Sequence, residues 1–260
     1  MSDVNAKYEA RGEEKKSSFE LLEWGKTIAG AFLVYLGFTT VAFANYAIPS
    51  ESMVPHLEVG DRVVVSKFSY GYSRFSLPFN LGVMLSRGEH RLFEQMPHRG
   101  DVAVFVHPFD NTKVMIKRII GLPGDVIEVR DGVLFINGEE STTSQPTTLL
   151  RLVRGGSRIS REFARRYEET IPGGVTHAVH DLTDAGRLDN FGPYTVPAGH
   201  FFAMGDNRDN SADSRDMNAM GPVPIENLIG RAEIVYYATG CGNDHTVACP
   251  MPRWMKPLHH

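Results

Sequence analysis

Apolar residues are distributed along this chain in two distinct ways. A stretch without any charged side chain runs from Thr27 to Ala47, and as a helix it would rise about 30 Å, the thickness of the hydrocarbon core of a bilayer. Beyond it, apolar residues come in short runs separated by glycine, proline and polar residues. This pattern predicts one membrane-length helix over residues 25–47, followed by a mostly β region.

Short strands are predicted where apolar and polar residues alternate or β-branched residues gather. The expected strands are residues 61–68, 101–106, 114–120, 125–129, 133–136, 201–204 and 230–238. Asp131-Gly132, between two of them, is typical of a tight hairpin turn. The fold class is therefore mostly β, with the strands in one closed or folded sheet system.

Residues 138–190 differ from the rest of the β region. They are rich in threonine, serine, arginine and glycine, show no catalytic pattern, and include one segment, Ser160–Glu169, predicted to form a short helix. We interpret them as an insertion that decorates the core. The expected parts are a tail at 1–24, a membrane helix at 25–47, a domain at 48–260 containing the insertion, and a C-terminal tail at 241–260.

Basic residues precede the apolar stretch, at Lys15, Lys16 and Lys26. Because lysine and arginine mark the cytoplasmic side of a span, we expect a cytoplasmic N-terminus and residues 48–260 on the other side. A cleavable signal peptide is the alternative, since Ala42-Phe43-Ala44 resembles a small-x-small cleavage site. The length of the stretch and the aromatic residues at its edges favour a retained span.

Composition narrows the classes of function. The net charge of −4 over 260 residues leaves no basic footprint for nucleic acid. Cys241 and Cys249, if they lie outside the cytoplasm, either form a small disulfide loop or remain free thiols. Zinc is not expected, because the only spaced histidine pair, His177 and His180, is far from both thiols in sequence. We expect no metal and no cofactor.

One serine and one lysine occupy positions suited to joint chemistry. Ser52 follows the apolar stretch, between Pro49 and Pro55, and no histidine lies in a recognisable hydrolase context. A lysine can act as the base if burial lowers its pKa by about three units, which takes roughly 4 kcal/mol. Lys117 lies in an apolar strand, where alternation gives it apolar neighbours and turns Arg118 away toward a carboxylate. Alone, each is more typical of a turn serine or an exposed lysine; together they indicate a serine–lysine hydrolase.

The run Gly205–Arg215 is the densest polar segment of the chain, with three aspartates, two asparagines, two arginines and two serines. A solvated loop is its ordinary interpretation. Aspartate and arginine interleaved so densely also suggest ion pairs and side-chain-to-backbone bonds that hold the loop in one shape. Gly205 would allow close approach of another backbone or of the lysine side chain.

In their order along the chain, these motifs resemble those of the bacterial type I signal peptidases, which are membrane-bound serine endopeptidases. The matching segments are Ser50–Leu57, Gly60-Asp61 with Lys67–Gly71, Arg99–Val102, Lys117–Asp125, Gly205–Arg215 and Gly230–Ala232. The resemblance implies a β catalytic core with a smaller inserted domain after the transmembrane helix. It also implies removal of signal peptides from exported preproteins after a small-x-small site, usually Ala-x-Ala.

The resemblance implies partners and a location as well. The partners would be preproteins bearing signal peptides and the lipid bilayer, with no nucleic acid and no metal. The chain would cross the bacterial inner membrane once, with a cytoplasmic N-terminus and a periplasmic catalytic domain. One departure concerns the span, since double-span members of the family have a second N-terminal helix and this chain has one.

Roles for individual residues follow from the same resemblance. Ser52 would be the nucleophile, Lys117 the general base, and Ser50 with the Ser52 N–H the oxyanion hole. Ser211 would orient the lysine amine. The remaining supporting residues would be Gly205, Asp213 and Arg215, and the substrate-binding residues Ile48, Pro49, Met53, Leu57 and Ile116. Glu51 is a second departure, because the family often has a small residue there.

Three other functions fit parts of the sequence. A self-cleaving repressor-type protease shares the serine–lysine chemistry, but those proteins are soluble and usually carry a DNA-binding segment. A specialised maturation peptidase with one client would have the same motifs. A catalytically inactive, membrane-anchored export scaffold would retain them only as vestiges, which the complete set of matched residues disfavours.

Overall fold

The computed structural model describes residues 23–76, 91–155, 158–183, 185–238 and 255–258. The chain divides into two compact units, Met1–Ala42 and Phe43–His260. Nearly all of the expected tail at 1–24 lies outside the described residues, and so do Cys241 and Cys249.

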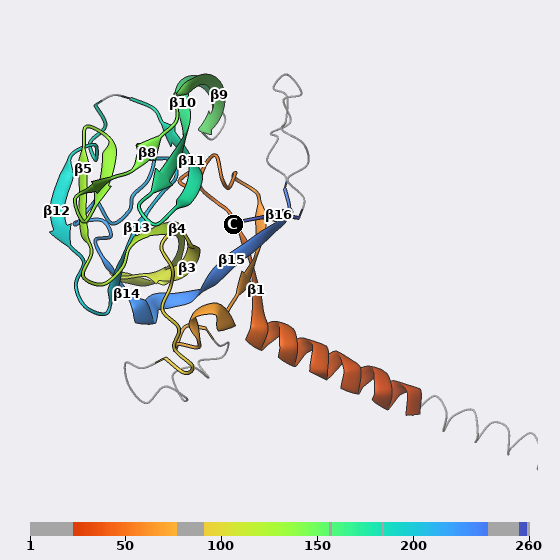
Figure 1. Ribbon diagram of the computed structural model, residues 1–260. Helices are drawn as coiled ribbons and strands as arrows, with labels where there is room; N and C mark the ends of the chain where they lie inside the picture. The colour runs from red at the N-terminus through yellow and green to blue at the C-terminus, as the bar shows by residue number, and fades with distance from the viewer. Residues whose placement is uncertain (1–22, 77–90, 156–157, 184, 239–254, 259–260) are drawn as a thin grey trace, which may run out of the picture. The chain divides into compact units, whose positions relative to one another are not determined.

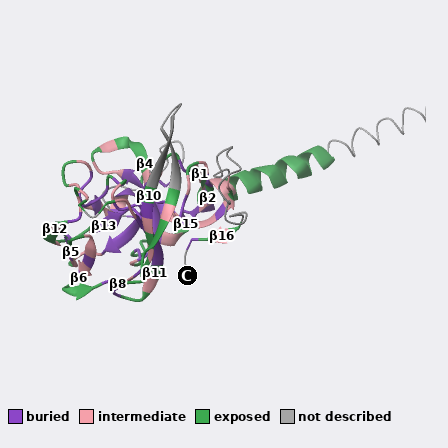
Figure 2. Ribbon diagram, turned by 90° about the horizontal axis from the view of Figure 1, so that it is seen from above, coloured by how far each residue is buried: buried purple, intermediate pink, exposed green. Residues whose placement is uncertain are grey.

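The first unit contains the helix Glu23–Ala42, whose 20 residues are long and apolar enough to cross a bilayer, judged by length and composition. Figure 2 shows its surface almost wholly exposed. The prediction of a helix over 25–47 is wrong at its end, because Phe43–Ala47 form strand β1. All five residues of β1 pair antiparallel with β2 (Arg62–Ser66), so hydrogen bonds to a distant segment replace those of a longer helix.

The second unit is built on one large antiparallel sheet, with the strand order β1-β2-β15-β3-β4-β13-β14 and β16 paired to β15 (Figure 1). Its other strands are β3 (Val102–His107), β4 (Asp110–Gly121), β13 (His200–Met204), β14 (Val223–Pro224), β15 (Leu228–Tyr237) and β16 (Lys256–Pro257). The predicted strands at 61–68, 101–106, 114–120, 201–204 and 230–238 are confirmed.

Alternation along β3 separates two clusters of buried side chains. Val102, Val104 and Val106 belong to one cluster, whereas Ala103 and Phe105 belong to another. Ala103 pairs with Lys117 of β4, and directly opposed residues share a face of the sheet. Lys117 is therefore directed to an apolar side of the sheet, as its strand pattern predicts.

A second sheet has the strand order β12-β5-β6-β7. Its strands are β5 (Val126–Arg130), β6 (Val133–Ile136), β7 (Glu139–Glu140) and β12 (Phe191–Thr195). The predicted hairpin is confirmed: Asp131 and Gly132 have φ angles of 48° and 81°, and a two-residue turn of this kind requires both to be positive. Its buried residues pack with Phe202 and Met204 of β13, which joins this sheet to the large one.

The third sheet consists of β8 (Thr142–Thr143), β9 (Thr147–Gly155), β10 (Arg158–Ile171) and β11 (Val175–Asp181). The prediction of a helix at Ser160–Glu169 is wrong, because this segment lies within β10. Pairing with β8, β9 and β11 supplies its backbone hydrogen bonds, and such tertiary pairing overrides a weak helical preference. The sheet falls inside 138–190 but also inside the second compact unit, so a separate inserted domain stays a prediction.

Of the expected C-terminal tail at 241–260, the structure describes residues 255–258. Lys256 and Pro257 pair with Val235 and Ile234 of β15. Leu258 is buried within the cluster that contains Val102 and Val104. These three residues therefore contact the large sheet, and burial of the Leu258 side chain stabilises that contact. The tail as a whole stays a prediction.

Candidate active site

Ser52 lies in a loop between β1 and β2 whose two ends are fastened together. The Ile48 N–H donates to the carbonyl oxygen of Asp61 at 2.9 Å, and the Gly60 N–H donates to the carbonyl oxygen of Ile48 at 2.8 Å. Met53 and Leu57 are fully buried in the cluster below. Ser52 itself is buried, so its hydroxyl is presented by a loop with little freedom to move.

Lys117 approaches Ser52 from the middle of β4. Its Nζ donates a hydrogen bond to Ser52 Oγ, and the lysine is 2% exposed. In the part of the chain that the structure describes, no carboxylate forms an ion pair with it. The serine–lysine pair predicted from two motifs 65 residues apart is thus brought into contact.

Burial changes the proton affinity of Lys117. Desolvation, reinforced by the charge of Arg215, outweighs the opposing charges of Asp213 and Asp206 and lowers its pKa from 10.5 to about 8. With that pKa, about a tenth of the amine is neutral at pH 7. A neutral amine in contact with a serine hydroxyl can accept its proton, so the arrangement is chemically that of a serine hydrolase with a lysine base.

Gly205 is the point at which three segments meet. A Cβ atom at this position would lie 2.2 Å from Ser211 Oγ and 2.5 Å from the carbonyl oxygen of Ser52. The close approach expected from the sequence is therefore present, and no side chain larger than hydrogen fits. Ser50 is exposed, and its Oγ lies 3.4 Å from Ser52 Oγ.

An ion pair supports the loop around Gly205. Arg215 donates to Asp213 through Nε and Nη2, both at 2.9 Å, and Asp213 also accepts the Gly205 N–H at 3.0 Å. Burial acts to raise the pKa of Asp213, but the charge and hydrogen bonds of Arg215 outweigh it and lower that pKa below its ordinary value. The carboxylate therefore stays charged within the core.

Of two further contacts expected from the sequence, the structure contains one and lacks the other among the described residues. Arg118 turns away from Lys117 and donates to Asp206 at 2.8 and 2.7 Å, which confirms the predicted carboxylate partner. Ser211 Oγ is buried beside Gly205 but has no hydrogen-bond partner among the described residues. Its role in orienting the Lys117 amine stays a prediction.

The expected substrate-binding residues divide by exposure. Ile48, Met53 and Leu57 are buried core residues, whereas Pro49 is exposed and Ile116 is partly buried. Only the last two present appreciable surface beside Ser52 and Lys117. The substrate-binding role of the five residues stays a prediction.

A buried polar group contributed by the third sheet was not predicted from the sequence. Glu169 of β10 forms an ion pair with Arg208 of the polar run and accepts a hydrogen bond from Ser141 Oγ at 3.1 Å. His177 Nε2 of β11 lies 3.4 Å from Glu169 Oε2. Burial, reinforced by nearby arginines, holds the pKa of His177 well below its usual range. No pattern around Glu169 distinguishes it in sequence from an exposed strand residue.

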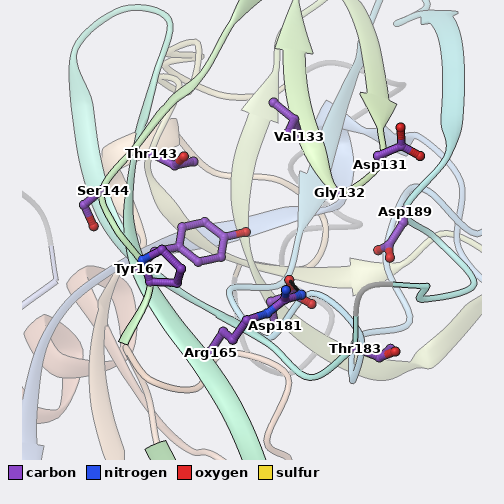
Figure 3. Close-up of a pocket in the computed structure, with 11 residues that line it drawn as sticks. Asp131, Gly132, Val133, Thr143, Ser144, Arg165, Tyr167, Asp181, Thr183 and Asp189 are labelled. Atoms are coloured by element: carbon purple, nitrogen blue, oxygen red, sulfur yellow. Dashed lines mark hydrogen bonds and ion pairs between the residues drawn. The ribbon is translucent and has the colours of Figure 1, made fainter. Parts of the chain in front are cut away.

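A separate polar pocket of about 200 Å³ lies between the β5–β6 turn, β8, β10 and the segment after β11 (Figure 3). Arg165, Tyr167 and Asp181 are among its lining residues. Burial and a hydrogen bond with Asp209 raise the pKa of Asp181 to about 6. None of the residues expected to act in catalysis or substrate binding lines this pocket. The Ser52–Lys117 contact is therefore kept as the candidate active site.

Comparison with known proteins identifies the family of this chain. The family model described as signal peptidase, peptidase S26, matches residues 21–237. Signal peptidase I of Pseudomonas fluorescens is 39% identical over 228 residues, covering 83% of this chain and 72% of the relative. Signal peptidase I of Rickettsia bellii (strain OSU 85-389) is 33% identical over 225 residues, covering 84% and 73%. The chain belongs to the signal peptidase family, peptidase S26, and is a serine peptidase, a hydrolase that acts in removing signal peptides.

A solved structure was also matched. The crystal structure of a signal peptidase I from Enterococcus faecalis V583 is 25% identical, with a TM-score of 0.30, and the match covers 53% of this chain and 97% of that one. This score is too low for the two folds to be compared in detail.

Proposed function

We propose that this chain is a membrane-bound serine endopeptidase that cleaves preproteins after a small-x-small site, with Ser52 as nucleophile and Lys117 as general base. The observation that carries the proposal is the hydrogen bond between Lys117 Nζ and Ser52 Oγ, made by two buried residues. The lowered pKa of Lys117 makes its amine a base near neutral pH. The family relationship supports signal peptides as the substrate.

The steps of the reaction follow from these contacts. The neutral amine of Lys117 takes the proton of Ser52 Oγ as the oxygen attacks the carbonyl carbon of the substrate. The Ser52 N–H and the Ser50 hydroxyl bind the oxygen on which charge develops. The lysine then gives the proton to the leaving amine, and in the second half of the reaction it activates the water that releases the acyl group from Ser52.

The proposed membrane anchor is the helix Glu23–Ala42. A single span with its N-terminus in the cytoplasm would put residues 48–260 on the periplasmic side, where signal peptides emerge. Resistance of the full chain to alkaline extraction from membranes, together with protease accessibility of residues 48–260 only from the periplasmic side, would support this topology. Release of the chain by alkaline extraction would refute membrane anchoring without affecting the proposed chemistry.

Cleavage of a preprotein with an Ala-x-Ala junction in detergent tests the chemistry. Wild type should cut after the second alanine, whereas Ser52→Ala and Lys117→Ala should not. Lys113→Ala is a matched control, because Lys113 lies on the same strand but its side chain is 67% exposed, and it should cut normally. Cutting that survives both active-site substitutions would refute the Ser52–Lys117 assignment. The small-x-small preference is tested with a second substrate, in which leucine replaces the second alanine, and wild type should not cut it.

A further inference from the structure

Asn207 touches the chain on both sides of Ser52. Its backbone N–H donates to the carbonyl oxygen of Ser52 at 3.1 Å. Its side-chain Nδ2 donates to the carbonyl oxygen of Glu51, also at 3.1 Å. Asn207 is 0% exposed, so neither bond competes with water. One buried residue therefore holds the peptide groups before and after the nucleophile.

The bond to Glu51 bears on catalysis because of what else that peptide group carries. The carbonyl of Glu51 and the N–H of Ser52 belong to one planar unit, and this N–H is the backbone donor of the proposed oxyanion hole. A hydrogen bond to the oxygen fixes the plane, and with it the direction of the N–H. It also polarises the amide, which strengthens the N–H as a donor.

The orientation of the Asn207 amide is determined by its surroundings. If the amide were turned over, Oδ1 would face the carbonyl oxygen of Glu51, and two acceptors would then be in contact. The neighbours of Asn207 are also held in place. The backbone carbonyl oxygen of Asp206 accepts the His180 N–H at 2.8 Å, and the Arg208 N–H donates to the backbone carbonyl oxygen of His180 at 2.8 Å. These two bonds tie both sides of Asn207 to β11.

We infer that Asn207 is a positioning residue of the oxyanion hole, which aims and strengthens the Ser52 N–H through the Glu51 carbonyl. This inference rests on the proposed function and extends it to a residue outside the serine–lysine pair. Asn207 touches no substrate atom in this role. Its loss should slow the chemical step while leaving substrate binding and the basicity of Lys117 unchanged.

The test compares Asn207→Ala and Asn207→Asp with wild type, as full chains in detergent, on the Ala-x-Ala preprotein. Asn207→Asp keeps the size of the side chain and removes the donor, so it remains informative if Asn207→Ala fails to fold. Asn210→Ala is the matched control, because Asn210 lies in the same loop with an exposed side chain. We expect kcat to fall about tenfold or more in both Asn207 variants, KM to stay within about twofold, and Asn210→Ala to resemble wild type.

The pH profile separates positioning from general loosening of the site. In Asn207→Ala, the midpoint of the acid limb of kcat should stay at the wild-type value, because Lys117 remains buried. A kcat within twofold of wild type in both variants would overturn the inference. So would a loss of activity accompanied by a shifted midpoint, since that would mean the lysine environment had collapsed. Activity that survives Ser52→Ala would instead refute the proposed function.

Discussion

Lys117 and Arg208 both have buried cationic side chains, but their surroundings shift the pKa of the two groups in opposite directions. Burial lowers the pKa of Lys117 to about 8, and no carboxylate pairs with it among the described residues. Burial acts in the same direction on Arg208, but the charge of Glu169 reverses the effect and raises the pKa of that guanidinium. Two things differ: the contacting carboxylate and the kind of cation. A buried amine without a carboxylate partner can lose its proton and act as a base, whereas a guanidinium paired with a carboxylate stays charged.

The largest expected effect comes from replacing the buried lysine with the other kind of cation. Lys117→Arg keeps the positive charge but cannot lose its proton at working pH, so cleavage should fall by at least ~1000-fold. The measurement is kcat on the Ala-x-Ala preprotein, with Lys113→Arg on the exposed part of the same strand as the control. Appreciable turnover by Lys117→Arg would remove the lysine from the role of base.

The second effect removes the carboxylate from the other cation. Glu169→Gln leaves Arg208 charged in the core with one direct partner fewer, and breaking a buried pair in this way destabilises a protein by about 3–5 kcal/mol. Urea unfolding of the full chain in detergent measures the change. Glu168→Gln is the matched control, since the Glu168 side chain is 49% exposed. A loss as small as that of the control would mean that Arg208 does not depend on Glu169.

The third effect concerns how much the buried charge of Lys117 lowers the free energy of unfolding. Because the folded-state pKa of Lys117 is lowered from 10.5 to about 8, the unfolded chain binds more protons between these values, and wild-type stability from this group rises with pH across the window. Lys117→Met should therefore be more stable than wild type by about 3 kcal/mol below pH 8.

That gain should shrink as pH rises toward 10.5, where both states of the wild type hold a neutral amine. Urea unfolding at several pH values between 7 and 10.5 measures it. A constant difference across this range would indicate that packing of the methionine, and not the lysine charge, is responsible.

The smallest effect is expected at an exposed pair. Arg130 Nη2 lies 2.6 Å from Glu128 Oε2, and the arginine side chain is 59% exposed. Solvent screens such a pair, so Glu128→Gln should leave the urea midpoint unchanged within error. If it destabilised the chain as strongly as Glu169→Gln, burial would not be what separates the two arginine–carboxylate pairs.

The parts of the fold that could be predicted are those whose cause is local. The Asp131-Gly132 turn needs two positive φ angles, and these residue types tolerate them. The alternating faces of β3 follow from the side-chain period of a strand. Ser52 and Lys117 could be named as candidate residues for the same reason, because the position of Ser52 after the apolar stretch and the apolar strand around Lys117 are both visible in the sequence.

The β class, the order of the motifs and the candidate residues Ser52 and Lys117 could be predicted from local patterns. Contacts between distant segments set the remaining features: Phe43–Ala47 and Ser160–Glu169 are strands, Glu169 reaches Arg208, and Asn207 holds the peptide groups around Ser52. The physical reason is the same in each case. Strand pairing, charge compensation and buried hydrogen bonds depend on a partner far away in the chain, and no local sequence pattern predicts which residue that partner is.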